Sequence, residues 1–239
     1  MTAPAEPRPR PGLAELLEHT SPKARADREA TQTLPVLEEL AALLPYRGLQ
    51  RGTATVVADT ALLLALTAGP LLANPSSFAA AVALPDLGLA AAAGHGIDLH
   101  RLLLADTPGE QWPEVLSALL PAADVVLLGP VAPTPAVAHR IGARLRQRGA
   151  VLLTTGPWPG ASLQLQVQAG RWSGLGDGHG QLISRQVRVH AAGRGLPGVG
   201  RTAELLLPDA HGRVAPVPAG ADRLPAPGQR HSAPRVRAL

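Results

Sequence analysis

The chain has 239 residues, of which 46% are hydrophobic but only 2% aromatic, so one domain with an interior built mostly of Ala, Leu and Val is expected. It contains no cysteine, which excludes disulfides, thiolate metal ligands and cysteine nucleophiles. Its formal net charge is +4 at pH 7, a value that hides an uneven distribution of charge along the chain.

Residues 1–33 are rich in proline and charge, without the apolar run of a signal peptide, and we predict a flexible N-terminal segment. Ordered structure is expected to begin with a helix over 34–44, where leucines recur at helical spacing. The longest apolar run, 61–73, is shorter than the ~20 residues that cross a bilayer. We therefore expect a soluble, cytoplasmic protein that does not contact a membrane.

Short apolar runs then alternate with helical segments, as in a parallel sheet that is covered on both faces. The predicted strands are 53–58, 78–84, 102–105, 124–128 and 150–155. A helix is expected to start near Thr60, and another after Asp106 and Thr107, which can cap it before Pro108. A third helix should bury Val137, with Ile141 and Leu145 on the same face, before the fifth strand.

The pattern changes after Pro159. Residues 163–168 alternate apolar and polar side chains, which is typical of a half-exposed strand, and further strands are predicted over 183–189 and 203–208. These strands predict an antiparallel extension of the parallel core. The folded domain is expected to span 34–217, followed by a disordered basic tail over 218–239 that is rich in Pro, Arg and Ala.

The connection between the first strand and its helix has no phosphate-binding loop. Only Asp59 and Thr60 fill the place where G-x-x-x-x-G-K-[ST] would cradle phosphates, and Lys23, the single lysine, lies in the N-terminal segment. The eight histidines show no metal-binding spacing and are expected at the surface or in turns. We predict neither a cofactor nor a metal. Trp112, Trp158 and Trp172 are interpreted as packing anchors, one of which could instead be an interface anchor.

The order of these segments resembles the core of the RecA-type recombinases. The turn 48–52 is similar to the one before their first core strand, 123–130 resembles their Walker B strand, and 161–189 resembles their late antiparallel strands. Segments 34–45, 84–88, 156–160 and 172–182 resemble the actinobacterial ImuA-type proteins, degenerate RecA relatives associated with translesion synthesis. The resemblance covers about 34–215. It implies an α/β, RecA-like core with a parallel sheet flanked by helices, plus a C-terminal antiparallel extension.

The chain departs from this family at the nucleotide site. Gly129 stands where the Walker B strand would end in a magnesium-holding Asp, and Asp86 lies near the place of the catalytic Glu. We therefore expect a degenerate nucleotide site near Asp59, Thr60, Asp86 and Gly129, and no enzymatic activity.

The resemblance implies a non-catalytic adaptor in DNA-damage-induced translesion synthesis. Its partner would be a Y-family-polymerase-like protein and, through that protein, an error-prone replicative polymerase and the sliding clamp. Two alternatives remain at this stage: a SulA-like cell-division inhibitor, since another degenerate RecA-like family has that role, and an atypical ATPase.

Charge is distributed unevenly along the chain. Residues 34–129 hold nine acidic and three basic side chains, a net charge of −6, whereas 130–239 hold fourteen Arg and four acidic side chains, a net charge of +10. Arg favours bidentate contact with phosphate or carboxylate, so weak, salt-sensitive DNA binding or docking of an acidic partner is possible, although a high-GC genome would also produce many Arg. The candidate contacts are Arg140, Arg144, Arg148, Arg188, Arg194, Arg201, Arg230, Arg235 and Arg237.

Overall fold

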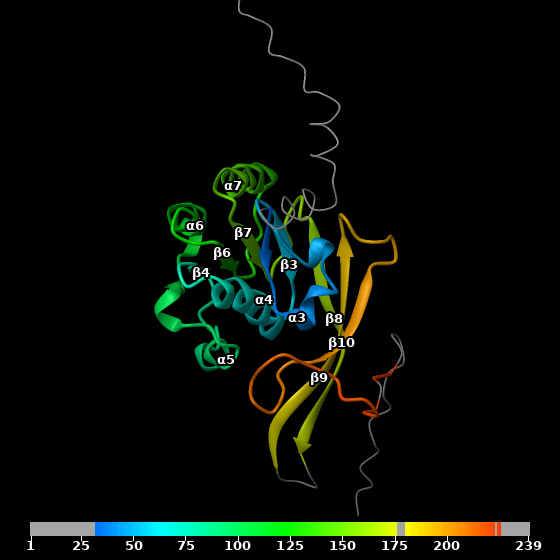
Figure 1. Ribbon diagram of the computed structural model, residues 1–239. Coiled ribbons are helices and arrows are strands. Elements are labelled where there is room, and N and C mark those ends of the chain that lie inside the picture. Colours follow the sequence, from blue (N-terminus) through cyan, green and yellow to red (C-terminus); the bar gives the residue numbers. More distant parts are fainter. Residues whose placement is uncertain (1–31, 176–179, 223, 226–239) are drawn as a thin grey trace, which may run out of the picture.

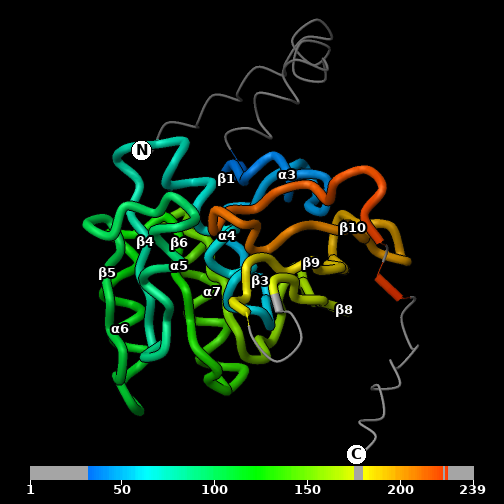
Figure 2. Tube along the Cα trace, turned by 90° about the horizontal axis from the view of Figure 1, so that it is seen from below, coloured from blue at the N-terminus to red at the C-terminus, as the bar shows by residue number. Residues whose placement is uncertain are grey.

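The computed structural model describes residues 32–175, 180–222 and 224–225. A nine-stranded sheet crosses the domain in the order β11-β10-β9-β8-β3-β7-β6-β4-β5, with β5 and β10 near its opposite ends (Figures 1 and 2). The strands are β3 (Ala54–Val57), β4 (Ala79–Val82), β5 (Leu102–Ala105), β6 (Val125–Leu128), β7 (Val151–Thr154), β8 (Leu163–Leu175), β9 (Gly180–Gly193), β10 (Arg201–Leu206) and β11 (Ala215–Pro216). This mixed α/β architecture confirms the predicted fold class, and all five predicted core strands form.

The six strands from β8 to β5 run parallel, and helices cover both of their faces. Strand β6 shows how the sequence produces this arrangement. Val125 and Leu127 join one apolar cluster, with α4 (Thr60–Ala73) and α5 (Leu89–Gly94). Val126 and Leu128 join a second cluster on the opposite face, with α6 (Trp112–Leu119) and α7 (Pro135–Arg148). The residues that face either side of the sheet must therefore all be apolar, which explains the near-continuous apolar runs.

Helix α4 is the central helix of the first face, where it lies among β3, α3 and α5 (Figure 1). Every residue from Leu62 to Leu71 is buried, so the helix has no polar side to present to water. The side chain of Thr67, the one polar residue in that stretch, donates a hydrogen bond to the Leu63 carbonyl at 2.9 Å. A helix of this kind is stable only when other elements surround it.

The antiparallel extension joins the core through β8. This strand lies parallel to β3 on one side, with Thr55 opposite Leu163, and antiparallel to β9 on the other. It continues to Leu175, well beyond the predicted end at residue 168. The far parts of β8 and β9 extend past the body of the domain (Figure 1).

The predicted helix over 34–44 is wrong. Leu34 belongs to a short strand, β1 (Thr33–Pro35), which pairs with β2 (Gly48–Gln50), and only α3 (Glu38–Ala41) is α-helical. The leucines are buried although the segment is bent rather than one continuous helix. Leu34, Leu40, Leu43 and Leu44 all belong to the first apolar cluster. The 3-10 turn η1 (Pro45–Arg47) then leads into β2.

The predicted N-terminal cap of the helix between the third and fourth predicted strands is also wrong. A 3-10 turn, η3 (Gly109–Gln111), precedes α6, which begins at Trp112 without a side-chain cap. Asp106 and Thr107 therefore lie in the loop that leaves β5 rather than at the start of the helix. The other two predicted helices form as α4 and α7, and Thr134 caps α7 by accepting from the Val137 N–H at 3.3 Å.

Part of the predicted disordered tail lies on the sheet. Leu224 is buried, and Asp222 accepts hydrogen bonds through its backbone carbonyl from Arg171 on β8 and Gln186 on β9. The predicted disorder of 226–239, like that of 1–31, concerns residues outside the described ones and stays a prediction. Among the helices that the structure describes, none is both long and apolar enough to cross a membrane.

Candidate functional site

Asp59 lies in the short connection between β3 and α4, where the sequence has no phosphate-binding loop. It follows β3 directly, and its Oδ1 accepts a hydrogen bond from the Leu62 N–H at 3.0 Å, which caps helix α4. Its Oδ2 forms an ion pair with the Arg185 guanidinium of β9 at 2.8 Å. Both side chains are largely buried, with 17% and 22% of their surfaces exposed. The positive end of α4 is thus already bound by a carboxylate, which is the role an incoming phosphate would have.

Gly129 is a packing position. Its N–H donates to the Val82 carbonyl at 2.9 Å, and a Cβ built on it would lie 1.8 Å from the Ala83 carbonyl oxygen. Ala83 itself has a left-handed φ of 56°, so the β4 end turns tightly against the β6 end. No side chain fits at residue 129 without movement of the backbone, and that excludes a magnesium-binding Asp there in this conformation.

The four residues of the degenerate site follow the carboxyl ends of three strands, but they do not form one constellation. Asp59 and Thr60 follow β3, Gly129 follows β6, and β7 lies between those strands. Asp86 is exposed beyond β4, and Thr60 is exposed at the first turn of α4. Within the described ranges, no group of three or more His, Asp or Glu side chains could hold a metal ion.

The predicted arginine contacts divide into two kinds. Arg140, Arg144 and Arg148 lie exposed along α7, and Arg194 is exposed in the turn after β9. Arg140 and Arg144 border a shallow hollow of about 350 Å³ together with Glu114 of α6. These four side chains remain available to a partner. Arg230, Arg235 and Arg237 lie outside the described residues.

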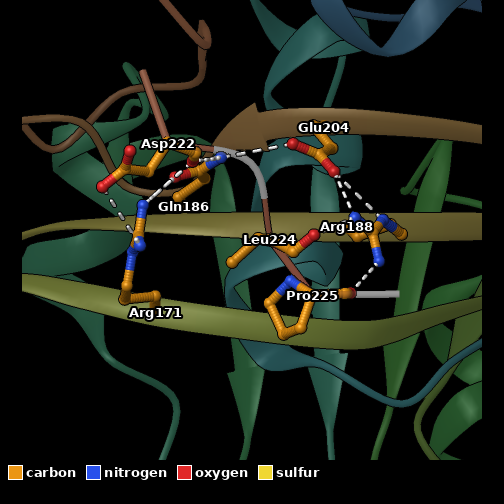
Figure 3. Close-up of polar contacts among 7 residues, drawn as sticks. All are labelled: Arg171, Gln186, Arg188, Glu204, Asp222, Leu224 and Pro225. Carbon is orange, nitrogen blue, oxygen red and sulfur yellow. Dashed lines mark hydrogen bonds and ion pairs between the residues drawn. The ribbon is translucent and has the colours of Figure 1, made fainter. Parts of the chain in front are cut away.

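Arg188 and Arg201 form contacts inside the domain, which gives both side chains a structural role, and their role as partner contacts stays a prediction. Arg188 donates to Glu204 Oε1 from Nη2 at 2.5 Å and to the carbonyls of Leu224 and Pro225 (Figure 3). Arg201 donates to the carbonyls of Ala42 and Leu44, which holds β10 against the segment after α3. Sequence alone does not distinguish these arginines from the exposed ones, because the partners lie 16 to 159 residues away.

One histidine and two tryptophans are part of the packing. His95 lies in the turn after α5, as predicted, but it is buried there, and burial lowers its pKa although the negative charge of Asp209 opposes this shift. Trp112 and Trp158 meet edge to face with ring centroids 6.4 Å apart, as packing anchors do. Trp172 is 45% exposed and lies under the Arg185 guanidinium at 6.0 Å, so it remains the candidate interface anchor.

One feature was not predicted from the sequence. It is a hollow at the amino end of β3, bordered by Tyr46, Arg51, Arg146 and Arg194 among others. Of these, only Arg194 was among the predicted contacts. The others belong to a short turn and to the part of α7 beside the predicted Arg row. The signal that could have found them is the segment Tyr46 to Gly52, which holds two arginines and an aromatic ring close together in the sequence.

Comparison with known sequences finds two partial matches. The family model for the MT3502 N-terminal domain matches residues 42–160, just under half of the chain. The "Uncharacterized protein Rv3395c" of Mycobacterium tuberculosis is 43% identical over 90 residues, which are 36% of this chain and 44% of that protein. The chain therefore covers less than half of the length of this mycobacterial relative.

Comparison with solved structures supports the RecA-like fold. The crystal structure of the RadB recombinase superposes with a TM-score of 0.51 over 76% of this chain and 97% of that chain, at 13% sequence identity. At this identity the likeness shows the fold alone. The RecA-like core and its antiparallel extension are thus confirmed, whereas the finer resemblance to the ImuA type stays a prediction.

Proposed function

We propose that the protein is a non-catalytic RecA-fold adaptor that supports DNA-damage-induced translesion synthesis by docking a Y-family-polymerase-like partner. The observation that carries the non-catalytic part is Asp59, which caps α4 and pairs with Arg185 at the position of a phosphate-binding loop. A carboxylate there repels phosphate and satisfies the helix end that phosphate would satisfy. At Gly129, after β6, there is also no room for the side chain of a magnesium ligand.

The docking part of the proposal rests on surfaces that folding leaves free. The α7 arginines and Arg194 are exposed, and Trp172 is half exposed on the extended β8–β9 pair. Aromatic and arginine side chains dominate the energetic centres of interfaces. An acidic patch on a polymerase-like partner would complement the arginines and fix its orientation.

Calorimetry with Mg-ATP and a capture assay test the proposal together. We expect no heat of ATP binding and no ATP turnover from the full chain, and we expect capture of a purified Y-family-polymerase-like protein. Capture of the division GTPase instead would favour the SulA-like alternative, and ATP turnover would favour the atypical ATPase.

The contribution of the tail is best tested by deleting 226–239 rather than the whole of 218–239. Residues 222, 224 and 225 contact β8 and β9, so a deletion from 218 would also remove internal contacts (Figure 3). The shorter deletion should leave the melting temperature unchanged and weaken capture. Equal capture by the truncated and full chains would place the interface on the folded domain.

A further inference from the structure

The amino edge of the sheet carries a groove that the degenerate nucleotide site does not explain. It has a volume of about 610 Å³, and its walls come from the segment 46–54 around β2, helix α7, the loop 158–162 and the turn 194–195. The Asp59 site lies at the opposite, carboxyl ends of the strands. We call this hollow the amino-edge groove.

The amino-edge groove is strongly basic. Arg51, Arg146, Arg194 and His139 line it, and its lining includes no Asp or Glu. Arg51 is partly neutralised by Asp124 at 3.6 Å. Arg146 and Arg194 are exposed and take part in no ion pair within 32–175, 180–222 and 224–225. Two guanidinium groups without a counter-charge beside one hollow favour a phosphate-bearing ligand.

The walls of the groove are held in place before any ligand binds. The Gly52 N–H donates to the Ala150 carbonyl at 2.9 Å, and Arg51 donates to the Gly149 carbonyl at 3.1 Å, so the turn is fixed to the end of α7. Gly52 has a φ of 74°, and a Cβ there would lie 2.9 Å from Arg146 Cα, so only glycine allows this approach. A rigid spacing of the arginines lowers the ordering cost of binding.

Tyr46 supplies an aromatic ring at the mouth of the groove. It is 53% exposed, and it also borders a smaller hollow of about 140 Å³ that continues past Gln50. Tyr46 and Arg47 both adopt a left-handed φ of 55°, a strained conformation that proteins keep mostly at functional positions. An exposed ring beside free arginines is the arrangement on which unpaired bases stack.

We propose that the amino-edge groove binds single-stranded nucleic acid, with Arg146 and Arg194 on phosphates and Tyr46 stacked on a base. Paired bases inside a duplex cannot reach the Tyr46 ring, which is why a single strand is the expected ligand. This inference goes beyond the proposed adaptor function and does not depend on the polymerase-like partner.

Fluorescence anisotropy of a labelled oligothymidine with the full chain tests the proposal. Arg146→Ala/Arg194→Ala should weaken binding at least about tenfold and make the slope of log K against log salt shallower by about 1.4, since each lost phosphate contact removes ~0.7. Tyr46→Asn, whose side chain tolerates the left-handed backbone, should weaken binding about tenfold without changing that slope.

The matched control is Arg140→Ala/Arg144→Ala, which removes the same charge from the helix that carries Arg146, but beside Glu114 and outside the groove. It should bind nearly as wild type, and all variants should melt at the wild-type temperature. The proposal is overturned if the control loses as much affinity as the groove variant, or if the groove variant binds normally. It is also overturned if a duplex or a free mononucleotide binds as tightly as the oligothymidine.

Discussion

Substitution at Gly129 should destabilise the fold strongly, because a side chain there would collide with the backbone of Ala83 rather than with a flexible side chain. A Cβ there would lie 1.8 Å from the Ala83 carbonyl oxygen, about 1.5 Å inside the ~3.3 Å at which carbon and carbonyl oxygen ordinarily meet. Overpacking of a core typically costs about 1–3 kcal/mol. We place Gly129→Ala at the upper end, about 3 kcal/mol, because both colliding groups are fixed by the hydrogen bond from Gly129 N–H to Val82.

For a domain of this size, that loss corresponds to a melting temperature about 6–12 °C lower. Thermal unfolding followed by circular dichroism measures it, and Gly198→Ala is the matched control. A Cβ at Gly198 meets nothing within 4 Å, so that variant should stay within about 0.5 kcal/mol of wild type. Gly129→Asp should be worse than Gly129→Ala, because it also buries a carboxylate. If Gly129→Ala melts with wild type, or if Gly129→Asp folds and binds Mg-ATP, the packing explanation of the degenerate site is refuted.

Three further predictions concern single polar residues. Asp59→Ala should lower the free energy of unfolding in urea by about 1–3 kcal/mol, and Asp59→Asn by less because Asn still caps α4; equal losses would mean that the cap contributes nothing. Arg188→Met should cost about 1–3 kcal/mol by leaving Glu204 without its counter-charge, whereas exposed Arg140→Ala should stay within about 0.5 kcal/mol. Because burial depresses the pKa of His95 below its ordinary 6.5, the unfolded chain takes up this proton first, and stability should fall as pH drops below about 6.5. His95→Gln should flatten stability between pH 7.5 and 5.5, about the range of that titration, and an unchanged slope would exclude His95 as the cause.

The parallel core could be predicted because both faces of its strands are buried, so the relevant signal is local. Runs such as 125–128 must be apolar at every position, and such runs are visible without knowing what they pack against. The segment 34–44 could not be predicted in the same way. Its leucines report burial, but burial in a helix and burial in a bent segment against α4 leave the same spacing.

Of the candidate site, the sequence predicts only the lack of a phosphate-binding loop. The absence of a phosphate-binding loop is visible in the sequence, but the role of Asp59 is not, since Arg185 lies 126 residues further along the chain. The same limit applies to arginines. Arg188 and Arg194 look alike in sequence, yet one is enclosed by Glu204 and the 224–225 carbonyls while the other is exposed at the amino-edge groove.

The position of β3 in the sheet has a consequence for synthesis on the ribosome. Its partners on the two sides are β7 and β8, both of which are translated about a hundred residues later; the Ser162 N–H and hydroxyl reach the Ala54 carbonyl across 108 positions. At ~5–20 residues per second, the strand and the apolar helix α4 wait about 5–20 s for their neighbours. During that interval the nascent chain exposes an unpaired strand edge and a leucine-rich helix, so its yield in the cell should depend on chaperones that hold emerging chains.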